Sequence, residues 1–89
     1  MKKIPYPLVE VTWLDAHTPD SGGWCKIADL TTWQDGVVSV SVGFLIDQNK
    51  KCVKIAASVN FDQTEKEVQD LSGTFVIPRG MVRRVRRLK

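Results

Sequence analysis

His17 is the first place to look for chemistry, because it is the only histidine and lies among acids and nucleophiles. Asp15 and Asp20 flank it, and Ser21 and Cys25 follow soon after. A nucleophile, a histidine and an acid can together activate a hydroxyl or thiol. However, the chain has no Gly-x-Ser-x-Gly elbow and no glycine-rich phosphate loop. We therefore expect a protein that is not an enzyme, in which His17 and Asp15 contact solvent or a bound ligand.

The two cysteines, Cys25 and Cys52, do not form a Cys-x-x-Cys pair. A zinc site would need both of them, His17 and an acid to converge from distant loops. We expect two separate thiols that behave as small hydrophobic side chains, with no metal and no cofactor.

The arginines offer the strongest charge signal. Residues 1–78 contain seven Lys and Arg against ten Asp and Glu, whereas residues 79–89 contain six Lys and Arg and no acid. The overall charge of +3 therefore hides a basic C-terminal segment. Guanidinium groups so placed protect a strand edge, bind phosphates through paired donors, or contact a partner protein. The candidates for a phosphate-bearing ligand are Arg79, Arg83, Arg84, Arg86 and Arg87.

Three tryptophans and one serine complete the candidate binding residues. Trp13 lies in an alternating segment and is expected in the core, where a large ring buries much apolar area. Trp24 and Trp33 lie in a polar region and are either core plugs or exposed platforms on which a base can stack. Ser41 interrupts a valine-rich run, so its hydroxyl needs a partner on a neighbouring strand or a polar cavity.

The element that must position these groups is the segment 37–46. It is rich in valine and carries aliphatic or aromatic residues at most positions, which suits a pleated and largely buried strand. Gly43 in its middle indicates a sharp bend or a close backbone contact, as at the corner of a small barrel. We predict that this segment is the buried central strand around which the other strands curl.

The remaining chain reads as one domain over residues 1–89, with residues 1–7 as an extended lead-in because two residues precede prolines. Residues 15–36 form a long loop that can include a short helix over 24–30, and such insertions often carry binding function. Residues 60–70 are polar and acidic and are expected as a solvated loop. The other predicted strands cover 8–14, 52–59, 71–77 and 82–88, with tight turns at 47–51 and at 78–80.

Three short motifs carry a resemblance. The spacing Gly-x-x-x-Ile-Pro-x-x-x-Val over 73–82 resembles the closing strand, turn and strand of SH3-like and Sm-like barrels. Trp13-x-Asp15-Ala16, the run Ser-Val-Gly-Phe-Leu at 41–45 and Val-Ile-Pro-Arg-Gly at 76–80 together resemble a group of small phage and prophage proteins of uncharacterised role. The resemblance implies a viral accessory protein in a bacterial cytoplasm. It supplies no catalytic motif.

The expected fold is therefore all-β in the main: a small five-stranded SH3-like or Sm-like barrel with a long loop or short helix between its first two strands. The expected function is non-enzymatic capture of an anionic, nucleotide-like ligand between the Trp-bearing loop and the Arg-rich strand, as in sequestration of a host nucleotide signal. A nucleic-acid binder of Sm-like type and an inhibitor that docks on a host protein are the alternatives. We expect a homo-oligomer in the cytoplasm and no membrane contact, because neither a signal peptide nor a spanning apolar run is present.

Overall fold

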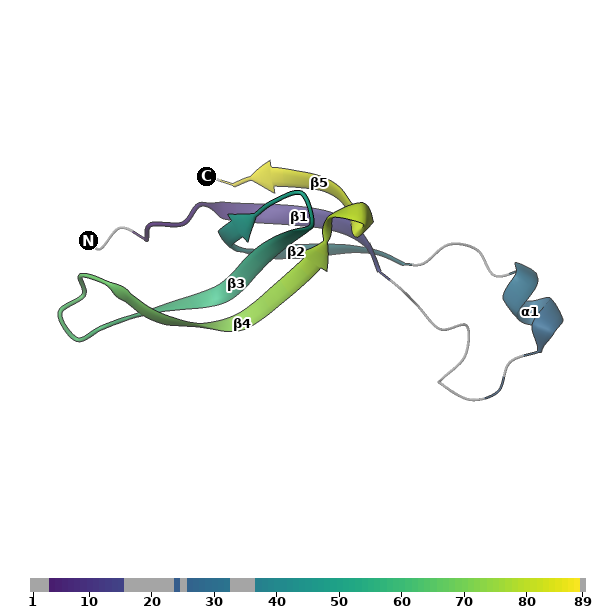
Figure 1. Cartoon of the computed structure of the whole chain (residues 1–89), viewed down its shortest axis with the longest axis horizontal. Helices are drawn as coiled ribbons and strands as arrows, with labels where there is room; N and C mark the ends of the chain where they lie inside the picture. The colour runs from purple at the N-terminus through teal and green to yellow at the C-terminus, as the bar shows by residue number, and fades with distance from the viewer. Residues whose placement is uncertain (1–3, 16–23, 25, 33–36, 89) are drawn as a thin grey trace.

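The protein folds as one antiparallel sheet of five strands (Figure 1). A computed structural model describes residues 4–15, 24, 26–32 and 37–88. The order across the sheet is β4-β3-β2-β1-β5. A short helix, α1, lies between β1 and β2, and a 3-10 turn, η1, joins β4 to β5. The bounds are β1 Leu8–Asp15, α1 Ile27–Thr32, β2 Val37–Gln48, β3 Cys52–Phe61, β4 Val68–Pro78, η1 Arg79–Met81 and β5 Val82–Arg87.

The prediction of a mainly β fold with five strands is confirmed, and β2 is the middle strand of the sheet as expected. Most strand ends lie within two residues of the prediction, and two elements differ more. The helix covers Ile27–Thr32, so it begins and ends later than the segment predicted over 24–30. β4 begins at Val68, inside the segment predicted as a loop, because Val68 pairs with Phe61 and Leu71 pairs with Val59 across the β3–β4 hairpin. Cross-strand pairing of apolar residues thus outweighs the local polarity of the sequence.

The prediction of a closed barrel is not confirmed. β4 and β5 are the two edge strands of the sheet, and they do not pair with each other in the part of the chain that the structure describes. Pro78 ends β4 without a backbone N–H, and η1 follows it directly, so the ladder of β4 is not continued into β5. The sheet is strongly bent but remains open.

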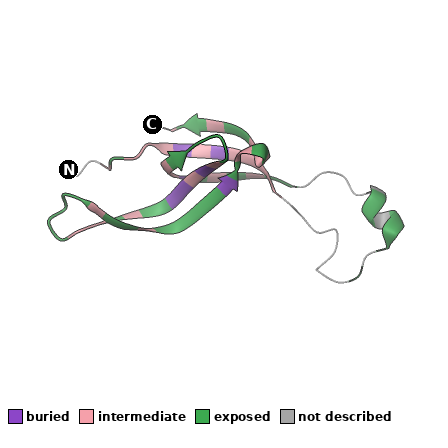
Figure 2. Cartoon of the chain, in the orientation of Figure 1, coloured by how far each residue is buried: buried purple, intermediate pink, exposed green. Residues whose placement is uncertain are grey.

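The core lies on one face of this bent sheet. Its fully buried side chains come from β1, β3 and the end of β4, as the purple segments of Figure 2 show. Partly buried residues from β1, β2, η1 and β5 pack against them. The buried cluster is Val9, Val11, Val53, Ile55 and Ile77, and the residues packed against it are Trp13, Leu45, Met81, Val82 and Val85.

The valine-rich strand β2 is not the buried strand that its composition predicts. Val38, Val40 and Val42 are 48%, 59% and 54% exposed. The cause is the register with β1, in which Ser41 lies opposite the buried Val11. Directly paired residues project to the same face, so the serines of β2 face the core and its alternate valines face outward.

The helix α1 contributes little to this core. Ile27 and Leu30 are 83% and 57% exposed, and Figure 1 shows α1 away from the sheet. Of the described helices, neither has the length and apolar content needed to cross a membrane.

Gly43 provides the close backbone contact that its position predicts. A Cβ placed on Gly43 would lie 2.8 Å from the carbonyl oxygen of Ala56 and 3.3 Å from the Cβ of Ile55. Ala56 pairs with Phe44, so this contact occurs where β2 leaves β1 and joins β3. A side chain at position 43 would push the two strands apart.

We therefore expect Gly43→Ala to lower the free energy of unfolding by about 1–3 kcal/mol, because the backbone of β3 cannot move aside as a side chain would. Chemical denaturation followed by tryptophan fluorescence measures this loss. Gly80→Ala is the matched control, since no atom lies within 4 Å of a Cβ at position 80. Equal destabilisation by both substitutions would contradict the steric explanation.

Candidate functional site

β5 is held in place by its apolar residues, which leaves its arginines outside the core. Val85 lies opposite the buried Val11, and Val82 lies opposite Trp13. Both valines pack against the core cluster. The strand belongs to the sheet edge because β1 pairs with it on one side only. We define the basic edge as the four arginines of this strand, Arg83, Arg84, Arg86 and Arg87, all of which are exposed.

The arginines of the basic edge extend to both faces of the sheet. Arg84 and Arg86 lie opposite Thr12 and Glu10, on the outer face, whereas Arg87 lies opposite Val9 and shares the core face. Between Thr12 and Trp13 the register shifts, and Arg83 is the residue of β5 that this irregularity leaves without a direct partner. Such a shift re-aims a side chain at a sheet edge. The result is a narrow ribbon with guanidinium groups on either side.

One of these arginines is neutralised within the chain. The Nη2 atom of Arg86 donates to Oε2 of Glu10 at 3.1 Å, an ion pair in which the Arg86 side chain remains 61% exposed. Among the described residues, Arg83, Arg84 and Arg87 form no ion pair. Three guanidinium groups on six consecutive residues therefore present their donors to solvent. Exposed guanidinium groups of this kind suit phosphate oxygens, which accept paired hydrogen bonds.

Arg79, predicted as part of the same site, is hydrogen-bonded within the chain. Its Nε donates to the carbonyl oxygen of Asn49 at 3.1 Å, and its Nη2 donates to Oε1 of Gln48 at 3.3 Å. Its backbone N–H also donates to the carbonyl oxygen of Lys51 at 2.8 Å. Arg79 therefore ties η1 to the turn between β2 and β3.

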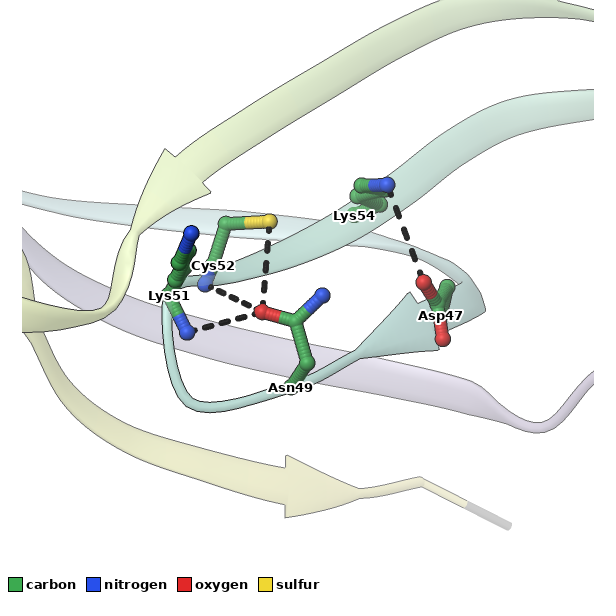
Figure 3. Close-up of polar contacts among 5 residues, drawn as sticks. All are labelled: Asp47, Asn49, Lys51, Cys52 and Lys54. Atoms are coloured by element: carbon green, nitrogen blue, oxygen red, sulfur yellow. Dashed lines mark hydrogen bonds and ion pairs between the residues drawn. The ribbon is translucent and has the colours of Figure 1, made fainter.

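Asn49 organises that turn (Figure 3). Its side-chain Oδ1 accepts from the backbone N–H of Lys51 at 2.7 Å and from that of Cys52 at 3.0 Å. An ion pair between Lys54 and Asp47, 3.7 Å apart, lies beside the turn. These hydrogen bonds hold the backbone of the turn in place.

Trp13 and Ser41, both predicted as members of one candidate site, are in contact in the structure. Nε1 of Trp13 donates to Oγ of Ser41 at 3.0 Å across the β1–β2 pair. The ring of Trp13 also meets the ring of Phe75 edge to face, with centroids 5.5 Å apart and an interplanar angle of 88°. Phe75 belongs to β4, so this contact links two strands that are not neighbours in the sheet. Trp13 therefore packs against the core, as predicted, and its ring is not a free stacking surface.

Of the other predicted site residues, the structure describes Trp24 and Asp15, and neither pairs with β5. Trp24 is fully exposed, at 102%, and precedes α1, which lies away from the sheet in Figure 1. Asp15 is half-buried at the end of β1, where it pairs with Val37 of β2. His17 and Trp33 lie outside the described residues.

Glu10 and Phe75 matter to this region and were not predicted. Glu10 is the acid that pairs with the basic edge. The sequence offered one signal for this pairing: Glu10 is the acid within the first predicted strand, and the last predicted strand has arginines but no acid. Phe75 gave no comparable signal, because its contact with Trp13 joins residues far apart in the sequence.

Asp62 stabilises the turn between β3 and β4. Its carboxylate accepts from Oγ1 of Thr64 at 2.6 Å and from the backbone N–H of Lys66 at 3.2 Å. The Thr64 hydrogen bond is the main reason that the pKa of Asp62 is lower than its usual value. This acidic turn, the one predicted as a solvated loop, is closed by local hydrogen bonds. It is thus distinct from the basic edge in both charge and structure.

Across the described ranges, no three His, Cys, Asp or Glu side chains come together in a group that would hold a metal ion. No protein-family model, curated protein or solved structure matches this chain.

The Trp13–Ser41 hydrogen bond yields a stability prediction. Ser41→Ala leaves the partly buried indole N–H without its acceptor, and we expect a loss of about 1 kcal/mol in the free energy of unfolding. Ser39→Ala is the matched control, because Ser39 lies on the same face of β2 and makes no side-chain hydrogen bond among the described residues. Denaturation curves of the two variants measure the difference. An equal loss in both would assign the effect to serine burial in general.

Proposed function

We propose that this protein is a non-enzymatic binding protein whose basic edge contacts the phosphates of a nucleic acid strand. The observation that carries the proposal is the set of three exposed arginines, Arg83, Arg84 and Arg87, with no acidic partner among the described residues. Phosphate contacts of this type give affinity without reading sequence. We therefore expect binding that depends strongly on salt and weakly on base sequence.

The shape of the basic edge favours an extended ligand. Alternate residues of a strand are about 6.6–6.8 Å apart, so the arginines are spread along β5 and over both of its faces. A chain of regularly repeated phosphates can contact such a ribbon at several points. A single small anion would engage only one or two of the guanidinium groups.

A nucleotide-type ligand is the second candidate, and Arg83 and Arg84 favour it because they are adjacent and neither is neutralised within the described chain. Trp24 is fully exposed, but it precedes α1, which lies away from the sheet in Figure 1, so this version rests on the arginines and not on stacking. In this version the protein sequesters a host nucleotide signal, as a viral accessory protein would in counter-defence. Both candidates go with the SH3-like or Sm-like relationship that the motif over 73–82 suggests, and the five antiparallel strands agree with it only at the level of a mainly β fold.

The decisive variant removes the three unpaired charges together: Arg83→Gln, Arg84→Gln and Arg87→Gln. Fluorescence anisotropy with a labelled single-stranded oligonucleotide, measured over a range of salt concentrations, gives the affinity and its salt dependence. Each phosphate contact contributes about −0.7 to the slope of log K against log salt for single strands, so we expect the triple variant to weaken the slope by about 2. We also expect its affinity at low salt to fall at least about tenfold.

A second triple variant controls for net charge. Lys50→Gln, Lys51→Gln and Lys66→Gln remove the same charge from exposed turn residues outside β5. This protein should retain the wild-type slope. If both triple variants lose affinity equally, binding follows total charge and not the basic edge. Calorimetry with cyclic and linear nucleotides separates the second candidate, because tight nucleotide binding without oligonucleotide binding would replace the first proposal.

A further inference from the structure

One of the two edges of β2 is paired with a neighbouring strand over only half of its length. On one side it pairs with β1 from Val37 to Phe44. On the other side it pairs with β3 only from Phe44 to Gln48. Within the described residues, the backbone over 37–43 therefore has no strand partner on that second side. A strand edge with free N–H and C=O groups is a template for another strand.

The side chains on this open segment suit another strand that is apolar and uncharged. Val38, Val40 and Val42 project outward and are about half exposed. Ser39 and Ser41 project to the opposite face. No charged residue occurs from Val37 to Ile46. The usual protection of an edge by charge is therefore present on β5 and absent from this part of β2.

We propose that a second copy of this chain occupies the edge, with the two β2 strands antiparallel about a two-fold axis at Val40. In this register Val40 lies opposite the partner's Val40, and Val38 lies opposite the partner's Val42. Ser39 lies opposite the partner's Ser41. Valine thus meets valine on the outer face, and serine meets serine on the other, which makes the segment complementary to itself.

The other strand edges are poorly suited to pairing with themselves. β5 carries four arginines, so two copies side by side would oppose like charges. β4 ends in Pro78, which lacks an N–H, and includes Asp70. The end of β3, over 57–61, is uncharged and also open on the β2 side, but it lacks the alternation of valine with serine that makes β2 complementary to itself. Charge, backbone chemistry and residue pattern together therefore favour β2 as the self-pairing edge.

Pairing over seven residues makes a contact smaller than the roughly 1,200–2,000 Å² typical of stable complexes, so we expect a dimer that dissociates in the micromolar range. It would produce one continuous run of strands in the order β5-β1-β2-β2-β1-β5. The two basic edges would lie at its ends, about 24 Å apart for five strand spacings of about 4.8 Å. If the proposed function holds, this arrangement lets one nucleic acid strand engage two basic edges at once.

Position 40 gives a direct test, because the two-fold axis places this residue opposite itself. Val40→Lys and Val40→Glu should each be monomeric, near 10.0 kDa, at concentrations where the wild type sediments as a dimer. An equimolar mixture of the two variants should recover the dimer, since lysine then lies opposite glutamate. Analytical ultracentrifugation over a concentration series measures all three samples.

Val76→Lys is the matched control: Val76 is 61% exposed, much like Val40 at 59%, but lies on β4. Its protein should dimerise as the wild type does. Circular dichroism and thermal unfolding test whether the position 40 variants are folded. We expect them to be folded, because the side chain at position 40 is largely exposed in the monomer. The proposal is overturned if the wild type is monomeric at several hundred micromolar, if folded Val40→Lys protein still dimerises, or if the mixture stays monomeric. None of these outcomes depends on nucleic acid, so the result is separate from that for the basic edge.

Discussion

The packing of β1 against β3 and the end of β4 constrains the orientation of side chains across most of the sheet. Val9 and Val11 are almost completely buried against a cluster that includes Val53, Ile55 and Ile77. Because side chains alternate along a strand, burying these two valines fixes the orientation of every other residue of β1. Because directly paired residues project to the same face, the register with β1 then fixes the side-chain orientation of β2 and β5, the two strands that pair with it.

This constraint separates two kinds of surface. On β5 it turns Val82 and Val85 toward the core and leaves the arginines outside, where only Arg86 finds a carboxylate in the described chain. On β2 it turns the serines toward the core and leaves the valines outside. The first surface is charged and suits phosphate, and the second is uncharged and suits another apolar strand. Both arise from one packing arrangement in a chain too short to bury all its apolar residues.

The change of partner along β2 connects these surfaces. The strand pairs with β1 as far as Phe44 and with β3 from Phe44 onward. The close approach of Gly43 to the backbone of Ala56, at this change of partner, is possible only without a side chain. Because β3 pairs with the second half of β2 alone, the first half keeps a free edge.

Local residue patterns were enough to predict five strands, the turns between them and the separation of charge. Five segments of β-favouring residues are bounded by glycine, proline and polar turns, and four of the five arginines lie in the last of these segments. These are local properties, set by backbone sterics and by residue order. Which face of β2 is buried depends on its register with β1, because its valines and serines alternate and a shift of one residue would exchange them. Only the tertiary structure paired Glu10 with Arg86 and Trp13 with Phe75, because these contacts join residues that local pattern does not relate. Closure of the sheet into a barrel could not be predicted from local pattern either. It depends on whether the two edge strands, β4 and β5, pair with each other, and not on the number of strands.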